Sequence, residues 1–262
     1  MTYRPTFLGV WMLATTACSI RDSAPGRPAA DSQVIPPSKI MDFSLLYARN
    51  CAGCHGANGK GGAAIGLADP VYLAIVDDAT IRRVTAGGVS GTAMPAFSQH
   101  SGGMLTDDQI DSIVAGIRGR WAKPNVLRDA NPPPYAAQSP GDAKRGGTVY
   151  GVYCSSCHST DGRGGKRASS IVDGSYLALV SDQNLRTTVI VGRPELGAPD
   201  WRGDVPGRPM SPQDVADVVA WLASQRPRFP GQPYSSALQT SRTTSPTGAQ
   251  GQSQSSVARI QQ

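Results

Sequence analysis

Histidine and cysteine are scarce in this sequence, which has three histidines and five cysteines among its 262 residues. Four of the cysteines belong to two copies of one short motif. A tetrahedral zinc site needs four donors, and each copy offers two thiols, one poorly placed neighbouring histidine and no fourth ligand. No strongly strand-like run precedes either copy, which argues against a thioredoxin-like dithiol. Zinc binding and dithiol exchange are therefore poorly supported.

Long hydrophobic runs and a strong charge of one sign are also lacking. The apolar run from Leu8 to Leu13 is too short to span a bilayer. The formal net charge of +6 is spread thinly: residues 39–123 hold 8 basic and 7 acidic side chains, and residues 141–228 hold 11 and 9. Regions so close to neutrality give no electrostatic basis for a nucleic-acid partner, and we expect none.

The motif that contains the cysteines occurs twice, 103 positions apart. Its copies are Cys51-Ala-Gly-Cys54-His55 and Cys154-Ser-Ser-Cys157-His158. Two cysteines at this spacing can add to the two vinyl groups of one haem, and a histidine directly after the second thiol can reach the iron from the proximal side. We therefore expect two covalently bound haem c groups, one on each copy.

The surroundings of the motif repeat as well. Tyr72-Leu-Ala-Ile-Val76 matches Tyr176-Leu-Ala-Leu-Val180 at an offset of 104. We call residues 39–123 the first repeat and residues 141–228 the second repeat. Apolar spacing predicts helices over 40–50, 70–76, 79–85 and 107–120 in the first repeat, and over 142–153 and from Pro212 onward in the second. Thr106 and Gln109 are expected to form a capping box at the start of the last helix of the first repeat, and Ser211 to cap that of the second.

The first repeat has a helix before the haem motif, then Met94-Pro95, then a closing amphipathic helix. This order resembles class I cytochromes c, and the second repeat replays it. The resemblance implies an all-α fold of two tandem class I cytochrome c domains, each a small helical bundle around a covalent haem. It also implies that His55 and Met94 ligate the first iron and that His158 is the proximal ligand of the second. A thioether ligand favours ferrous iron and raises its potential.

The second repeat has no methionine that corresponds to Met94. The offset of 104 leads to Ala198, and alanine cannot ligate iron. Met210 is the nearest sulfur in the sequence, but it aligns with Leu105, an apolar residue just before a helix cap. His100 is the one histidine outside the motifs. It is interpreted as a solvated loop residue or as a ligand that reaches the second haem from the first repeat. The sixth ligand of the second iron is left open.

Two arginines recur at the same place in each repeat. Leu185-Arg186 matches Ile81-Arg82 at the offset of 104. Their guanidinium groups could donate charge-assisted hydrogen bonds to the haem propionates, or they could belong to an exposed helix face.

The repeats also differ where their first and last helices are expected to cross. In class I cytochromes a small residue on one helix meets an aromatic residue on the other, and the second repeat keeps this pair as Gly146 and Trp221. The first repeat has Phe43 and Gly116 at the equivalent places. We predict that Phe43 packs over Gly116.

The remaining segments indicate export and connection. Residues 1–17 show an early cation, an apolar run and small residues, the order of an export signal. Thr15-Thr-Ala17 before Cys18 resembles a bacterial lipobox, although leucine is usual at the first of these places; a plain cleaved signal is the alternative. We expect residues 18–38 to be a flexible tether, 124–140 a Pro-rich linker and 229–262 a disordered tail.

The resemblance implies a di-haem c-type cytochrome that transfers single electrons between redox proteins in an extracytoplasmic respiratory chain. Such a protein transforms no substrate, although it can be one subunit of a larger oxidoreductase complex. We expect it in the bacterial periplasm or at the cell surface, anchored to the membrane as a lipoprotein through Cys18. The alternative is a haem ligand-binding or peroxidase-like protein that acts at an open second iron, although no Arg-His pair typical of peroxide cleavage stands out.

Overall fold

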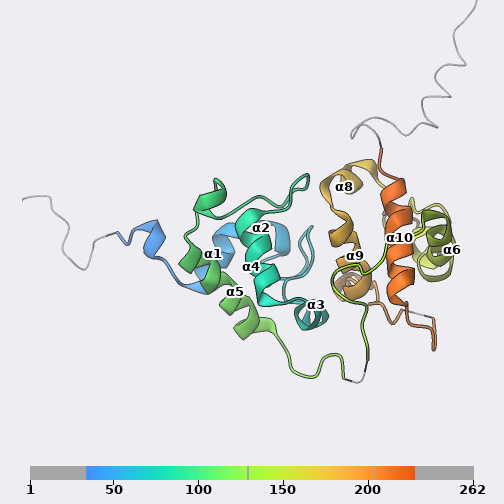
Figure 1. The fold of residues 1–262 in the computed structure, drawn as a ribbon, viewed down its shortest axis with the longest axis horizontal. Coiled ribbons are helices and arrows are strands. Elements are labelled where there is room, and N and C mark those ends of the chain that lie inside the picture. Colours follow the sequence, from blue (N-terminus) through green and yellow to red (C-terminus); the bar gives the residue numbers. More distant parts are fainter. Residues whose placement is uncertain (1–33, 129, 204, 228–262) are drawn as a thin grey trace, which may run out of the picture. The chain divides into compact units, whose positions relative to one another are not determined.

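A computed structural model describes residues 34–128, 130–203 and 205–227 of the chain (Figure 1). These residues form helices joined by loops, with isolated β-bridges but no strand among them, so the all-α prediction is confirmed. None of the described helices is long and apolar enough to cross a membrane. The chain divides at Lys39, and before that point one 3-10 helix, η2 (Pro37–Lys39), is described. The predicted export signal, Cys18, most of the tether and the tail lie outside the described residues.

The helices of the first repeat begin where side chains cap them. Asp42 accepts from the Leu45 N–H at 2.8 Å and starts α1 (Phe43–Asn50). Thr106 and Gln109 form the predicted capping box of α5 (Asp107–Trp121). The other elements are α2 (Ala52–His55), α3 (Pro70–Ile75), α4 (Asp78–Gly87) and the 3-10 helix η3 (Gln99–Ser101). Each predicted helix of this repeat is present, with ends that differ by a few residues at most.

The second repeat follows the same order. Its elements are α6 (Ala143–Tyr153), α7 (Ser155–His158), α8 (Gly174–Leu179), α9 (Asp182–Val191), the 3-10 helix η4 (Pro194–Leu196) and α10 (Pro212–Ser224). Ser211 caps α10 and Pro212 occupies its first position, as predicted. Proline is suited to this place because the first helical N–H has no acceptor within the helix.

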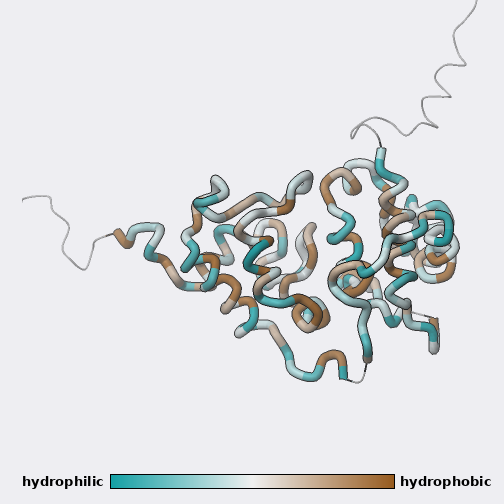
Figure 2. Tube along the Cα trace, viewed as in Figure 1, coloured by the Kyte–Doolittle hydropathy of each residue, from teal (hydrophilic) through white to brown (hydrophobic). Residues whose placement is uncertain are grey.

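Apolar residues at helical spacing form the interior of each repeat. Ile110, Ile113 and Ile117 lie along one face of α5 and are at most 1% exposed. Val215 and Val218 lie along one face of α10 and are likewise at most 1% exposed. Figure 2 shows hydrophobic and hydrophilic residues alternating along the helices. Burial of these apolar stripes stabilises helices that are marginal in isolation.

The crossing of the first and last helices is tight in both repeats. In the first, a Cβ atom on Gly116 would lie 2.1 Å from Cδ2 of Phe43, so the phenyl ring fills the space above this glycine. In the second, a Cβ atom on Gly146 would lie 2.0 Å from the carbonyl oxygen of Asp217 and 2.8 Å from Cβ of Trp221. The predicted contact between Phe43 and Gly116 is confirmed. The aromatic residue comes from α1 in the first repeat and from α10 in the second.

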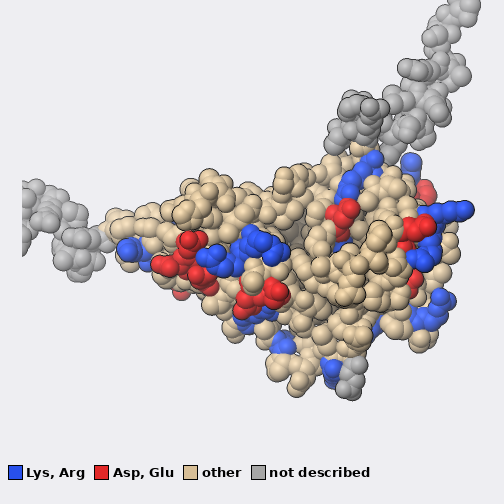
Figure 3. All heavy atoms as spheres, in the orientation of Figure 1, with Lys and Arg blue, Asp and Glu red and all other residues tan. Residues whose placement is uncertain are grey.

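Charged side chains are mixed on the surface. On the face drawn in Figure 3, basic and acidic groups lie beside one another rather than in separate fields. Several of them form exposed ion pairs, such as Arg82 with Asp111 at 2.6 Å. Pairs of this kind contribute little to stability, on the order of 1 kcal/mol or less.

Candidate haem sites

A tyrosine of the first helix fixes the chain on both sides of each motif histidine. The Cys51 N–H donates to the carbonyl of Tyr47 at 2.9 Å, which carries α1 directly into the first motif. The Tyr47 hydroxyl donates to the carbonyl of Gly56 at 2.9 Å. Tyr150 makes the matching hydroxyl bond to Ser159 in the second repeat. The short helix that carries the second thiol and the histidine is thereby held at its start and its end.

The motif histidines are oriented by backbone carbonyls. Nδ1 of His55 lies 2.8 Å from the carbonyl oxygen of Ile65, and Nδ1 of His158 lies 2.8 Å from that of Ser169. Because a carbonyl can only accept, Nδ1 carries the proton and Nε2 keeps its lone pair for a metal. Partners of this kind fix the ring orientation of metal-ligating histidines. Burial also lowers the pKa of His55, which favours the neutral imidazole that a metal requires.

The thiols next to these histidines are free. Cys51 is buried and Cys54 exposed, while Cys154 and Cys157 are half-buried. Two free thiols and one imidazole with an available Nε2, repeated in each half of the chain, form the donor set that covalent haem c requires. The residues present therefore fit the implied cofactor, with Cys51, Cys54 and His55 at one site and the second motif at the other.

The loop that follows α4, the first strap (residues 88–97), holds Met94 by its backbone. Gly88 has φ +66°, and a Cβ atom there would lie 2.8 Å from the Met94 carbonyl oxygen, so only glycine fits. The Val89 N–H donates to that carbonyl at 3.0 Å. The Met94 N–H in turn donates to Oγ1 of Thr92 at 3.1 Å. The backbone of Met94 is thus fixed through both of its polar groups.

The loop that follows α9, the second strap (residues 192–201), has the same design. Gly192 has φ +71°, and a Cβ atom there would lie 2.7 Å from the carbonyl oxygen of Ala198. The Arg193 N–H donates to the Ala198 carbonyl at 3.0 Å. The glycine contact and the bond to the carbonyl match those of the first strap, whereas the Ala198 N–H donates to the Arg193 carbonyl at 3.1 Å instead of to a hydroxyl. Ala198 therefore occupies the backbone position that Met94 occupies in the first strap.

The other two candidate ligands of the second iron lie elsewhere. The Met210 N–H donates to the Trp201 carbonyl at 2.8 Å, just as the Leu105 N–H donates to the Phe97 carbonyl at 2.8 Å. Met210 and Leu105 are each 6% exposed, so Met210 repeats the packing position of Leu105. His100 lies in η3, and 82% of its side chain is exposed.

The recurring arginines Arg82 and Arg186 have different surroundings. Arg82 is exposed and pairs with Asp107 and Asp111 of α5. Arg186 is 3% exposed, and its Nε and Nη2 donate to the linker carbonyl of Pro134 at 3.1 and 2.8 Å. The exposed-face interpretation therefore holds for Arg82 and is wrong for Arg186. A role of either residue toward a propionate stays a prediction.

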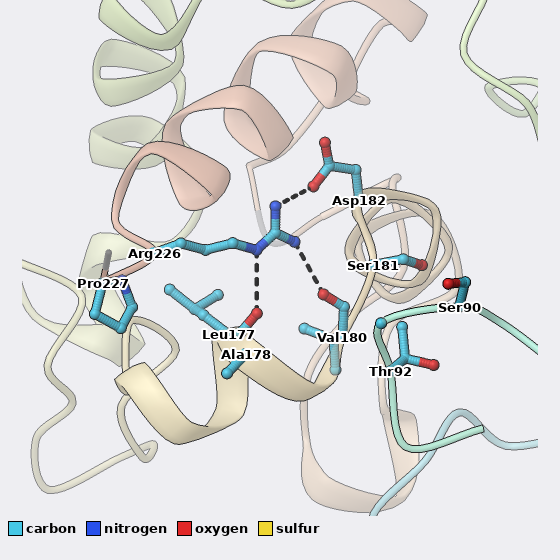
Figure 4. Close-up of a pocket in the computed structure, with 10 residues that line it drawn as sticks. Ser90, Thr92, Leu177, Ala178, Val180, Ser181, Asp182, Arg226 and Pro227 are labelled. Carbon is cyan, nitrogen blue, oxygen red and sulfur yellow. Dashed lines mark hydrogen bonds and ion pairs between the residues drawn. The ribbon is translucent and has the colours of Figure 1, made fainter. Parts of the chain in front are cut away.

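Sequence reasoning missed Arg118 and Arg226, which make the same contacts in the two repeats. Each closes the C-terminal end of a short helix, α3 or α8, and pairs with the aspartate that begins the next helix. The partners are the carbonyls of Leu73 and Val76 and the carboxylate of Asp78 for Arg118, and the carbonyls of Leu177 and Val180 and the carboxylate of Asp182 for Arg226. Figure 4 shows the contacts of Arg226. The pocket beside it, of about 380 Å³, is lined by none of the motif residues and is not a haem site.

Sequence reasoning also missed Trp121, and it placed Trp221 at the helix crossing without its contact to the loop after the motif. In each repeat an indole packs on the tyrosine of the first helix and reaches the glycine-rich loop after the motif. A Cβ atom on Gly59 would lie 3.1 Å from Cη2 of Trp121, and one on Gly162 would lie 3.3 Å from Cη2 of Trp221. The two tryptophans thus occupy equivalent places although they stand at different positions along their helices.

The helical repeats and the duplicated haem-binding geometry define tandem c-type cytochrome domains. The family model for "Cytochrome C oxidase, cbb3-type, subunit III" matches residues 39–115 and 141–222, which is more than half of the chain. The chain belongs to this family.

Curated relatives include subunits of two kinds of complex. The cytochrome bc1 complex cytochrome c subunit of Mycobacterium bovis (strain ATCC BAA-935 / AF2122/97) is 27% identical over 192 residues, which cover 71% of this chain and 64% of that protein. The Cbb3-type cytochrome c oxidase subunit CcoP of Azospirillum sp. (strain B510) is 32% identical over 154 residues, which cover 52% and 45%. This chain thus spans less than two thirds of either relative. Among solved structures, the Kuenenia stuttgartiensis reducing HAO-like protein complex Kustc0457/Kustc0458 aligns with a TM-score of 0.42 and 16% identity, over 71% of this chain and 96% of that chain.

Proposed function

We propose that this chain is a di-haem electron carrier that passes single electrons between redox proteins of an extracytoplasmic respiratory chain. The observation that carries the proposal is the duplicated histidine geometry, with Nδ1 bonded to a carbonyl and Nε2 available in both repeats. Cys51 and Cys54 would bind one haem, and Cys154 and Cys157 the other. Bound haem supplies a one-electron iron couple, and the protein supplies the ligands and the exclusion of water.

The names of the relatives support a role within a larger assembly. They are cytochrome c subunits of a bc1 complex and of a cbb3-type oxidase. By analogy, the present chain would deliver or receive electrons as a subunit or partner of such a complex. It would carry electrons without transforming a substrate.

The two irons would have unequal ligands. His55 and Met94 would ligate the first iron, and the order of the haem motif, Met94-Pro95 and the closing helix in this repeat supports the assignment. His158 would be the proximal ligand of the second iron. A neutral thioether sulfur favours the ferrous state, so the first haem would have the higher potential. Electrons would then run downhill from the second repeat to the first.

The place of action would be the periplasm or the cell surface, with a lipid anchor at Cys18. The small residues before this cysteine and the attachment of haem c outside the bacterial cytoplasm support the proposal. Replacement of Cys18 by serine would move the holoprotein from the membrane fraction to the soluble fraction. A variant that stays in the membrane fraction would argue for another anchor or for a partner complex.

The function is tested by counting haems and electrons in the purified full-length protein. We expect two haems per chain by the pyridine haemochrome assay and two electrons per chain in an anaerobic reductive titration. The double variants C51A/C54A and C154A/C157A are matched controls, and each should retain one haem and accept one electron. Fewer than two haems in the unaltered protein, or haems that exchange no electrons with a soluble redox partner, would contradict the proposal.

A further inference from the structure

The backbone of the second strap is locked with alanine in the place of the methionine ligand. Arg193 and Ala198 form an antiparallel bridge in which each N–H donates to the other's carbonyl, at 3.0 and 3.1 Å. Gly192 adds a close backbone approach that excludes a side chain at that position. A methyl group is therefore held where the first strap holds a thioether.

The nearest sulfur is bound into the core instead. Met210 is 6% exposed, and its N–H donates to the carbonyl of Trp201. Trp201 is 2% exposed, and its own N–H donates to the Ile190 carbonyl at 3.0 Å. Ligation by Met210 would require this buried side chain to leave the core, next to a backbone that these bonds hold in place. The other methionines of the described residues outside the straps, Met41 and Met104, belong to the first repeat.

The side chains beside Ala198 favour a neutral occupant. Arg193 of the strap and Arg202 directly after it are each paired with a nearby carboxylate, Glu195 at 2.6 Å and Asp200 at 2.5 Å. Nη2 of Arg193 also donates to the carbonyl of Gly62 at 2.8 Å. These cations are already compensated, so they offer little attraction to an anion. Alanine is shorter than methionine by Cγ, Sδ and Cε, so the side chain at position 198 ends three heavy atoms before the reach of a methionine.

We propose that the second haem has no protein ligand at its sixth position and that Ala198 leaves this position open to a neutral diatomic molecule such as CO or NO. The inference goes beyond electron transfer, although it rests on haem attachment at the second motif. The first haem, closed by Met94, does not bind such a molecule. One chain thus combines a closed haem and an open haem on the same backbone design.

Carbon monoxide is the probe that tests this. The full-length protein is first shown to hold two haems, then reduced without oxygen and titrated with CO, and sites per chain are counted from the Soret change. We expect one site in the unaltered protein, none in A198M and two in M94A. M210L is the matched control, because it removes the one methionine of the second repeat at nearly constant volume, and it should keep one site.

The outcomes separate this inference from the proposed function. Two haems with no CO site would overturn the inference and leave the electron carrier intact. A site that appears only in M210L would identify Met210 as the sixth ligand and would likewise overturn it. A second site in the unaltered protein would contradict the closure by Met94. A haem count below two would contradict the proposed function itself.

Discussion

The first strap carries Met94 and the second carries Ala198 at the same backbone position. Both straps begin with a glycine in the left-handed region, and both close with an N–H bond of 3.0 Å to the carbonyl of that residue. The shape of the strap therefore depends on glycine and backbone bonds, not on the side chain that would meet the iron. If Met94 is the iron ligand, the strap could lose that ligand, as at Ala198, without a change in its backbone.

A second difference concerns an aromatic and a guanidinium group near the C-terminal end of each repeat. Arg118 precedes Trp121 in the first repeat, whereas Trp221 precedes Arg226 in the second. Each repeat still places one guanidinium on the carbonyls of its short helix and one indole beside its glycine-rich loop. The contacts are preserved although the residues that make them have exchanged order along the chain, with Arg118 inside α5 and Arg226 just after α10.

The helix crossing of the first repeat gives the largest expected effect on stability. Gly116→Trp would force an indole into the space of the Phe43 ring and should destabilise the protein by about 3 kcal/mol, the upper end for overpacking. Gly119→Trp is the matched control, because no atom lies within 4 Å of a Cβ there, and it should change stability by less than about 0.5 kcal/mol. Chemical denaturation of the two variants measures the difference.

A double variant sharpens the same comparison. Phe43→Gly combined with Gly116→Trp recreates the pair that the second repeat has in Gly146 and Trp221. It should recover part of the loss seen with Gly116→Trp alone, which a double-mutant cycle would report as favourable coupling. Purely additive losses would contradict the equivalence of the two crossings.

A buried carboxylate distinguishes the second repeat, and its replacement should give the next largest loss of stability. Asp217 is fully buried and accepts from the Asp142 N–H at 2.8 Å, from Gln213 at 3.0 Å and from Arg145. Asp217→Asn would weaken these charge-assisted bonds and should cost about 2 kcal/mol of stability near neutral pH. Ser112→Ala, at the equivalent place in the first repeat, should cost much less.

The same carboxylate makes stability depend on pH. Burial alone would raise the pKa of Asp217, but the bonds from Arg145, the Asp142 N–H and Gln213 outweigh it and hold the pKa below its usual value. The stabilisation is therefore complete well above the unfolded pKa of about 4 and is lost as the pH falls through the folded value. Denaturation midpoints between about pH 6 and pH 3 should fall more steeply for the unaltered protein than for Asp217→Asn. Parallel curves would show that this group does not titrate on unfolding.

Replacement of Arg118 or Arg226 should give the smallest loss of stability. Arg118→Ala and Arg226→Ala should each cost about 1 kcal/mol, because the guanidinium groups bind helix-end carbonyls but remain partly exposed to water. Arg120→Ala, which removes an exposed hydrogen bond to Ser44, is the control and should be close to neutral. Hydrogen exchange of α3 and α8 would localise the loss: each variant should affect the short helix of its own repeat.

Part of this architecture could be predicted from the sequence because it depends on local signals at a fixed offset. The motifs and the Thr106 and Ser211 caps follow from residue type and position, whereas the contact of Phe43 with Gly116 also needed the resemblance to class I cytochromes c. Arg118 and Arg226 could not be found in this way, since they stand 108 positions apart while their carbonyl partners stand 104 apart. The tryptophans are 100 apart. A long side chain can reach the same point from another turn of a helix, and spacing alone does not reveal where it ends.

The burial of Arg186 was beyond sequence reasoning for a related cause. Its counterpart Arg82 pairs with carboxylates on α5, whereas Arg186 is covered by the linker and binds the Pro134 carbonyl. Which segment covers a helix face depends on the path of a loop, and no local pattern in the linker specifies that path.

The central claim is that one fold holds two unequal haems, and potentiometric titration tests it most directly. The unaltered holoprotein should show two one-electron waves, with the upper wave missing in C51A/C54A and the lower wave missing in C154A/C157A. Met94→Ala should move the upper wave downward and leave the lower one in place. If the upper wave instead disappears with the second motif, the assignment of the two irons and the direction of electron flow are both wrong.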